Sequence, residues 1–221
     1  METKICGARL PEEIDILEQE AVRYCGLWTG IEGHPNDLDD LRFTTLAARC
    51  RNLTPVAVCV RKPVQQVIAL LTPTRVRMVQ LHGFNTPRDV AMLKDAGFTV
   101  IKTLHLGEDG ACPEARWISA YDKAGCDIYL MDRFGGADQI GSCGKALPEP
   151  VLRDWRHRLA GRRLWLAGGL TPDRIALLSE EGGIEAFDID SAARHGGHIC
   201  RKAARMLVTA ARPAESYRHI A

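Results

Sequence analysis

The sequence predicts an α/β fold, a single-domain (β/α)8 barrel of the TIM type, and two observations support this prediction. Eight short apolar runs alternate with stretches of helical periodicity, and strands separated by single helices form right-handed βαβ units in a parallel sheet. The length of 221 residues fits eight such units in one compact domain over residues 1–221. A doubly wound open sheet is the alternative, but it usually has fewer strands at this length.

The expected strands are the apolar runs themselves, which have the length that is typical of strands. In chain order they cover residues 4–6, 24–28, 56–60, 77–82, 99–104, 127–132, 164–168 and 185–190.

Between the strands, apolar residues recur with the period of an amphipathic helix. Residues 85–97 and 170–183 each have Thr-Pro at their start and glycine at their end, which are good start and stop signals for a helix. In the last helix, the spacing of Ile199, Ala203 and Met206 predicts that these three side chains share the buried face.

Charge and composition exclude several classes of protein. The 29 Lys and Arg nearly balance the 28 Asp and Glu, so no net field attracts nucleic acid or an anionic membrane. No apolar run is long enough to span a bilayer, and the first residues lack the apolar core of a signal peptide. The eight cysteines form no Cys-x-x-Cys pair, and we expect reduced thiols in a cytoplasmic protein.

Two side chains at strand ends are the candidate catalytic residues. The active site of such a barrel lies at the carboxyl ends of its strands, where Cys6 ends the first strand and Asp132 the sixth. Lys4 shares one face of its strand with Cys6, and a nearby ammonium group lowers the pKa of a thiol. A carboxylate at the end of an apolar strand is costly without a partner or a role, and a helix cap or an ion pair is the alternative for Asp132.

A glycine pair, Gly168 and Gly169, follows the seventh strand and precedes a helix that opens with Thr-Pro. Glycine amides at a helix N-terminus can hold a phosphate, and the loops after strands seven and eight are the usual phosphate site of this fold. A tight turn that requires glycine is the other interpretation of this pair.

Taken together, these residues resemble the phosphoribosylanthranilate isomerase family. Six short motifs are similar to motifs of that family and follow one another in the same order over nearly the whole chain. They are KICG (4–7), VQLHG (79–83), VIK (100–102), GSCGK (141–145, against G-G-[ST]-G-K), LAGGLTPDRI (166–175) and FDIDSA (187–192, against V-D-V-S-S-G).

The resemblance implies an Amadori rearrangement in tryptophan biosynthesis, from an aminoribose 5-phosphate to a 1-amino-1-deoxyribulose 5-phosphate, without cofactor or metal. It implies that Asp132 is the general acid and Cys6 the general base. Arg42 matches the arginine that faces the anthranilate carboxylate, and Asp188 matches an aspartate near the amine of the substrate. His82 is assigned to the substrate as well, with a structural histidine as the alternative. The implied partner is a small phosphosugar, and we expect a monomer or a homodimer.

The eighth strand departs from the family pattern at its phosphate loop. Asp190 replaces the first serine and Ala192 the glycine of S-S-G, while Ser191 is kept. An ionised aspartate repels a phosphate and can only accept hydrogen bonds, so Arg194 is a candidate for a compensating cation. The expected phosphate site consists of Asp190, Ser191 and Ala192 together with Gly168 and Gly169.

The second strand departs as well, because residues 26–42 read GLWTGIEGHPNDLDDLR where the family has G-F-V-F-Y-P-x-S-x-R. Three functions therefore stay open. The first is isomerisation of phosphoribosylanthranilate or a close analogue. The second is a different reaction on the same barrel in a secondary-metabolite pathway, and the third is a catalytically silent relative that only binds a ligand.

Two smaller features carry less weight. His195 and His198 lie close together in sequence, as metal ligands can, but histidines flanked by glycine in a loop are usually solvated. Lys102 ends the VIK motif and either lines the barrel mouth or is a satisfied structural lysine.

Overall fold

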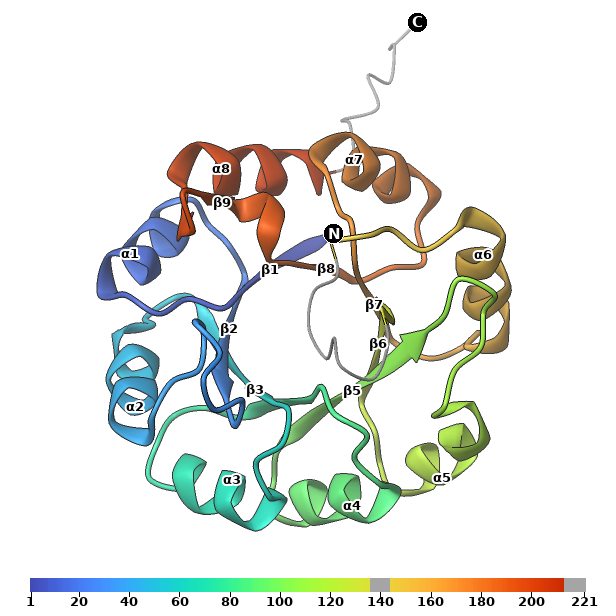
Figure 1. The fold of residues 1–221 in the computed structure, drawn as a ribbon, viewed down its shortest axis with the longest axis horizontal. Coiled ribbons are helices and arrows are strands. Elements are labelled where there is room, and N and C mark those ends of the chain that lie inside the picture. The colour runs from blue at the N-terminus through green and yellow to red at the C-terminus, as the bar shows by residue number, and fades with distance from the viewer. Residues whose placement is uncertain (136–143, 213–221) are drawn as a thin grey trace, which may run out of the picture.

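The computed structural model describes residues 1–135 and 144–212 and confirms the (β/α)8 barrel. Eight parallel strands close into a ring, because β1 pairs with β8 as well as with β2 (Figure 1). Each predicted strand is present with small shifts at its ends: β1 Glu2–Cys6, β2 Tyr24–Thr29, β3 Thr54–Cys59, β4 Met78–Leu81, β5 Thr99–Leu106, β6 Ile128–Arg133, β7 Leu164–Ala167 and β8 Ala186–Ile189.

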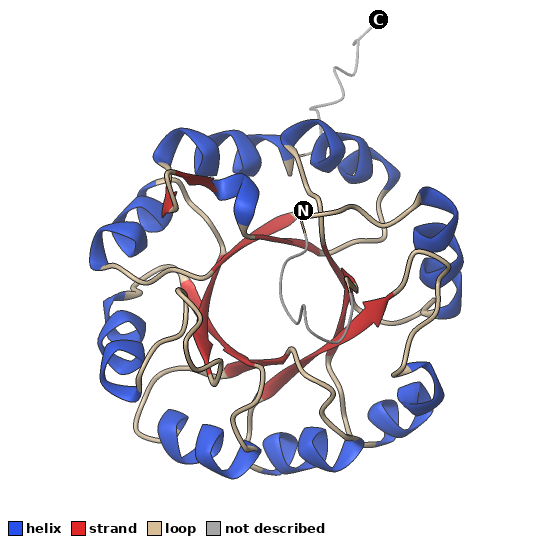
Figure 2. Cartoon of the chain, viewed as in Figure 1, coloured by secondary structure: helices blue, strands red, loops and turns tan. Residues whose placement is uncertain are grey.

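The helices form an outer ring around the strands (Figure 2). They are α1 Pro11–Gln19, α2 Asp40–Arg49, α3 Val64–Leu71, α4 Pro87–Asp95, α5 Ile118–Lys123, α6 Glu149–Arg158, α7 Pro172–Glu181 and α8 Arg201–Ala210. Short 3-10 turns, η1 Ala115–Trp117 and η2 Ser191–Ala193, precede α5 and follow β8. A two-stranded antiparallel hairpin, β9 Arg194–His195 with β10 His198–Ile199, leads into α8.

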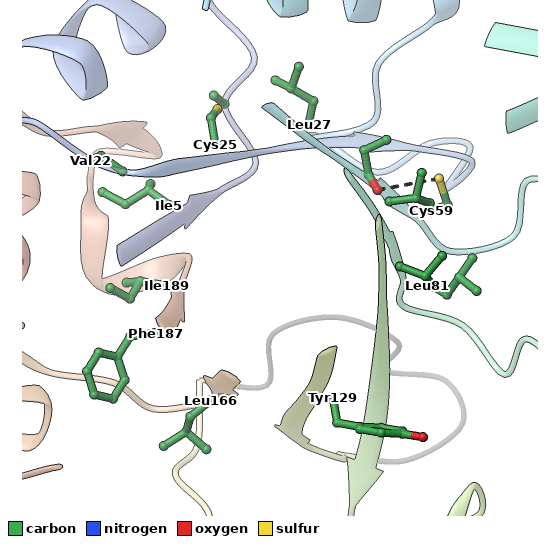
Figure 3. Packing of buried hydrophobic residues seen from close by; sticks show 14 of the residues in the cluster. Ile5, Val22, Cys25, Leu27, Cys59, Leu81, Tyr129, Leu166, Phe187 and Ile189 are labelled. Atoms are coloured by element: carbon green, nitrogen blue, oxygen red, sulfur yellow. Dashed lines mark hydrogen bonds between the residues drawn. The ribbon is translucent and has the colours of Figure 1, made fainter. Parts of the chain in front are cut away.

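Alternation along the strands divides the interior into two layers. Odd positions of β1 and β2 such as Ile5 and Leu27 point outward and pack against the helices, and Figure 3 shows these two side chains among others of this layer. Even positions such as Cys6 and Trp28 point into the barrel, where they meet Val58 and other inward side chains. The outward layer stabilises the barrel, and the inward layer ends at the carboxyl side in polar groups.

The start signals of α4 and α7 act as the sequence predicts. At the start of α4, the backbone N–H and the hydroxyl of Thr86 both donate to Oδ2 of Asp89. Thr171 precedes α7, and its Oγ1 accepts a hydrogen bond from the backbone N–H of Arg174. These bonds satisfy amide groups that have no partner within the helix.

The predicted buried face of the last helix is wrong. Ile199 belongs to β10 and lies before the helix, and Met206 is 48% exposed. The residues of α8 that face the core are Ala204, Leu207 and Val208. The spacing was counted from a residue that is not helical, so it selected a neighbouring face of the helix.

Within residues 1–135 and 144–212, no helix combines the length and the apolar character that crossing a membrane would require.

Candidate active site

A pocket lies at the carboxyl ends of the strands, and polar or reactive side chains from several strands converge there. Its enclosed volume is about 30 Å³, which is room for one or two water molecules. The lining includes both predicted catalytic residues and four further side chains: Cys6, Trp28, Gln80, His82, Asp132 and Asp188.

The thiol of Cys6 is held between two N–H groups. The Lys4 ammonium donates to Sγ at 3.2 Å and the Trp28 indole N–H donates at 2.8 Å. Burial and the nearby Asp188 raise the pKa of Cys6 to about 12, while Lys4 and Trp28 act in the opposite direction. Gly26 provides the space, because a Cβ at that position would lie 2.5 Å from Sγ.

Lys4 and Asp188 form a buried ion pair across the β1–β8 junction. Lys4 Nζ lies 2.7 Å from Asp188 Oδ1, and the lysine is fully buried. Burial by itself lowers the pKa of Lys4, but the Asp188 carboxylate and Cys6 outweigh it, so the pKa is raised and Lys4 stays charged. The lysine therefore supplies a fixed positive charge beneath Cys6.

Asp132 lies at the end of β6 and is 3% exposed. Its Oδ2 is 3.7 Å from His82 Nε2, and its buried Oδ1 has no hydrogen-bond partner among the described residues. Burial, and secondarily the charge of Asp188, raise the pKa of Asp132 to about 7. A substantial fraction of this carboxyl is therefore protonated at neutral pH, which suits a proton donor.

Gln80 and His82 link the two halves of the pocket. Gln80 Nε2 lies 3.1 Å from His82 Nδ1 and 3.4 Å from Asp188 Oδ2. Burial, and then the positive neighbourhood, lower the pKa of His82 well below its usual range, so the ring is neutral. With Nδ1 accepting from the amide, the proton of the ring is assigned to Nε2, which faces Asp132.

The model of the family described as N-(5'phosphoribosyl)anthranilate (PRA) isomerase matches residues 3–199 of this sequence. The chain belongs to the phosphoribosylanthranilate isomerase family.

Individual isomerases of the family resemble the chain over most of its length. The N-(5'-phosphoribosyl)anthranilate isomerase of Hyphomonas neptunium is 30% identical over 231 residues, covering 96% of this chain and 97% of its own. The crystal structure of TrpF from Jonesia denitrificans superposes with a TM-score of 0.72 at 26% identity, with 96% of each chain covered. The phosphoribosyl anthranilate isomerase of Thermotoga maritima reaches a TM-score of 0.77 at 18% identity, with 96% of this chain and 98% of its own covered, and shows the likeness of fold.

The residue that departs most from the family's phosphate loop, Asp190, is paired. Arg194 Nε lies 2.7 Å from Asp190 Oδ1, so Arg194 is the compensating cation that the sequence suggests. The same guanidinium donates to the backbone carbonyls of Cys6 and Gly7, at 2.9 and 2.7 Å. The ion pair therefore also anchors the corner that follows β1.

The predicted phosphate-binding residues all line the pocket: Gly168, Gly169, Asp190, Ser191 and Ala192. Both glycines have positive φ, and a Cβ at Gly169 would lie 2.3 Å from the backbone nitrogen of Ala146. The close approach of this backbone to the loop before α6 thus requires glycine, independently of any ligand.

Two residues with an expected place at the barrel mouth, Arg42 and Lys102, do not line the pocket. Arg42 is an exposed residue of the first turn of α2, and its guanidinium donates to the backbone oxygen of Arg9. Lys102 points out of the barrel, where its Nζ donates to the carbonyls of Gly83 and Thr103 and lies 3.6 Å from Glu114. Lys102 is therefore a satisfied structural lysine. Residues 141–143 of the GSCGK motif lie outside the described residues.

The sequence prediction missed two pocket residues that form hydrogen bonds, Trp28 and Gln80, as well as the apolar lining residues Ala167, Leu170 and Ile189. Gln80 carries a signal that was available, because it lies two positions before His82 and therefore on the same face of β4. Trp28 follows Gly26 with the same period, but its indole contacts Cys6 only because β1 and β2 are in register. Among the described residues, no group of three or more His, Cys, Asp or Glu side chains could hold a metal ion.

Proposed function

We propose that the chain catalyses the Amadori rearrangement of N-(5'-phosphoribosyl)anthranilate to the corresponding 1-arylamino-1-deoxyribulose 5-phosphate, a step of tryptophan biosynthesis. Membership of the family supports this reaction. The observation that carries it is the pairing of Cys6 with Asp132 in one pocket, where Asp132 has a pKa of about 7. The rearrangement needs a general acid and a general base, and the carboxyl of Asp132 and the sulfur of Cys6 can fill these two roles.

Ring opening is assigned to Asp132. The carboxyl donates its proton to the ring oxygen of the ribose as the bond from C1 to that oxygen breaks. The lone pair of the substrate nitrogen forms the C1=N bond of an iminium ion, and the ring oxygen becomes a hydroxyl group. His82 lies beside Asp132, and its lowered pKa keeps the ring neutral. Asp132, rather than the histidine, is therefore the proton donor of this step.

Proton removal from C2 is assigned to the Cys6 thiolate. The electron pair of the C2–H bond forms C1=C2 and neutralises the iminium nitrogen, and loss of the O2 proton with protonation of C1 gives the ketone. The pKa of Cys6 is raised in the resting pocket. The cationic iminium and the Lys4 ammonium both favour the thiolate, so the base form is stabilised when it is needed.

The phosphate group of the substrate is assigned to the loops after β7 and β8, at Gly168, Gly169, Ser191 and Ala192. The Asp190 carboxylate weakens this assignment in electrostatic terms, and its pairing with Arg194 supports it, because the pair is close to neutral. Asp188, with Gln80, is assigned to the amine side of the substrate.

Purified protein tests the proposal with phosphoribosylanthranilate, whose conversion is followed by loss of fluorescence. Cys6→Ser and Asp132→Asn are each expected to lower turnover about a hundredfold or more with the fold intact by circular dichroism. Wild-type protein without turnover would refute the proposed reaction, and near-native activity of either variant would remove that residue from the mechanism.

A second candidate, a related reaction on a different substrate, is favoured by Asp190. Asp190→Ser removes a carboxylate and frees Arg194, so the Michaelis constant for phosphoribosylanthranilate should fall several-fold if the family substrate is the true one. An unchanged constant beside good wild-type activity would mean that Asp190 does not face the phosphate. Loss of a native reaction on another substrate in the same variant would favour the second candidate.

The oligomeric state is proposed to be a monomer or a homodimer. One solved structure of this fold is titled as monomers of the dimeric enzyme of Thermotoga maritima, at 17% identity. Sedimentation equilibrium of the purified chain distinguishes the two states, and a larger assembly would contradict both.

A further inference from the structure

The sulfur of Cys6 has two neighbours that can only donate hydrogen bonds. A protonated lysine and an indole nitrogen carry hydrogens but no acceptor lone pair. Both lie within bonding distance of Sγ, at 3.2 Å for Lys4 and 2.8 Å for Trp28. Such a pair of donors stabilises the thiolate more than the thiol, because hydrogen bonds to an ionised acceptor are the stronger ones.

The indole of Trp28 is held in this orientation by contacts on both sides. Trp28 is 3% exposed, and its ring stacks on His34 with 4.9 Å between ring centroids. His34 is itself fixed, because its Nδ1 accepts a hydrogen bond from the backbone N–H of Asn36 at 3.1 Å. The backbone oxygen of Trp28 accepts from the N–H of Leu38, so the loop after β2 folds back over the tryptophan.

We propose that Trp28 is a positioning residue for the proposed base: its indole N–H aims Sγ of Cys6 into the pocket and stabilises the thiolate. This rests on the proposed function for its catalytic meaning, but the thiolate itself can be measured separately.

Charged and titratable groups from each neighbouring strand act on the same sulfur. Lys4 of β1 favours the thiolate, while Asp188 of β8 and Asp190 after it disfavour it. Cys25 of β2 is a buried thiol, and the charge of Cys6 is one of the causes that raise its pKa. Two carboxylates therefore oppose a single ammonium, and an additional neutral donor has a clear electrostatic use at this position.

The rate of Cys6 alkylation by iodoacetamide reports the thiolate fraction when the pH lies below the thiol pKa. Trypsin cleaves after Lys4 and Arg9, so the peptide of residues 5–9 contains Cys6 as its single cysteine and mass spectrometry can follow it alone. Trp28→Phe removes the donor and keeps a ring. We expect alkylation of Cys6 at about pH 8 to slow by about tenfold, the effect of roughly one pKa unit.

A change in the access of iodoacetamide to Cys6 would not produce the same result. Phenylalanine is smaller than tryptophan, so the variant opens the approach to Sγ and obstruction cannot explain a slower reaction. Trp28→Gln restores an N–H donor, because its side-chain nitrogen lies the same number of bonds from Cα as the indole nitrogen. We expect this variant to react within about threefold of the wild-type rate, and turnover of phosphoribosylanthranilate to rank the three proteins in the same order.

Trp155→Phe is the matched control. Trp155 of α6 is also buried, and its indole donates to the backbone oxygen of Gly110 at 3.0 Å, outside the barrel. It should lower the melting temperature without changing the alkylation of Cys6. Equal rates in wild type and Trp28→Phe, or equal slowing in the Phe and Gln variants, would overturn the proposal. The expected order of alkylation without any turnover would keep the role of Trp28 and refute the proposed function instead.

Discussion

Replacement of Asp132 by asparagine should raise the stability of the protein in alkaline solution while it removes activity. The change keeps the shape of the side chain and deletes its ionisable group. Asp132 is 3% exposed, its Oδ1 has no partner among the described residues, and the charge of Asp188 is near. A carboxylate in this position is costly, and the neutral amide avoids that cost.

The size of the effect follows from the pKa. Burial raises the pKa of Asp132 from 3.8 to about 7, so the folded state binds its proton more tightly than the unfolded chain. The resulting stabilisation is fully present below pH 3.8 and is lost as the pH rises through 7. One pKa unit corresponds to about 1.4 kcal/mol, so the contribution of Asp132 to the free energy of unfolding falls by about 3 kcal/mol between about pH 5 and pH 8.

Urea unfolding of both proteins at the two pH values measures this difference. We expect the free energy of unfolding of Asp132→Asn, relative to wild type, to be higher at pH 8 than at pH 5 by about 2–3 kcal/mol. Asp95→Asn, at the exposed end of α4, is the control and should show little difference between the two pH values. A relative stability of Asp132→Asn that is the same at both pH values would refute the reasoning, because the folded pKa would then not be raised.

Two further predictions concern the surroundings of Cys6. Gly26→Ala places a Cβ 2.5 Å from Cys6 Sγ and 3.1 Å from Lys4 Nζ, so the sulfur must shift. We expect kcat, measured by steady-state kinetics, to fall about tenfold or more. A fully active variant would show that the position of the sulfur is not critical. Lys4→Met leaves Asp188 buried without its cation and should cost about 3–5 kcal/mol in urea unfolding; a loss below about 1 kcal/mol would mean that solvent reaches the pair.

Much of the fold could be predicted because it is written in local periodicity. Eight apolar runs of strand length, separated by helical stretches, leave few arrangements other than a barrel. The starts of α4 and α7 are likewise local, because each is signalled by the dipeptide Thr-Pro. Cys6 and Asp132 could be predicted as site residues for the same reason. The end of a strand can be located in the sequence, and the fold places the carboxyl ends of all strands at one mouth of the barrel. The last helix shows the limit, because a shift of its start by two residues changed the predicted face.

The contacts that determine the chemistry were decided by the tertiary structure. Lys4 meets Asp188 across 184 positions of the sequence, and Trp28 meets Cys6 because β1 and β2 pair in one register. Such contacts depend on register and side-chain conformation, which local sequence patterns do not encode. By itself, the sequence determined which residue types stand at the mouth of the barrel. The closed ring of strands decided which of them touch, and therefore which carboxyl keeps its proton and which sulfur receives two donors.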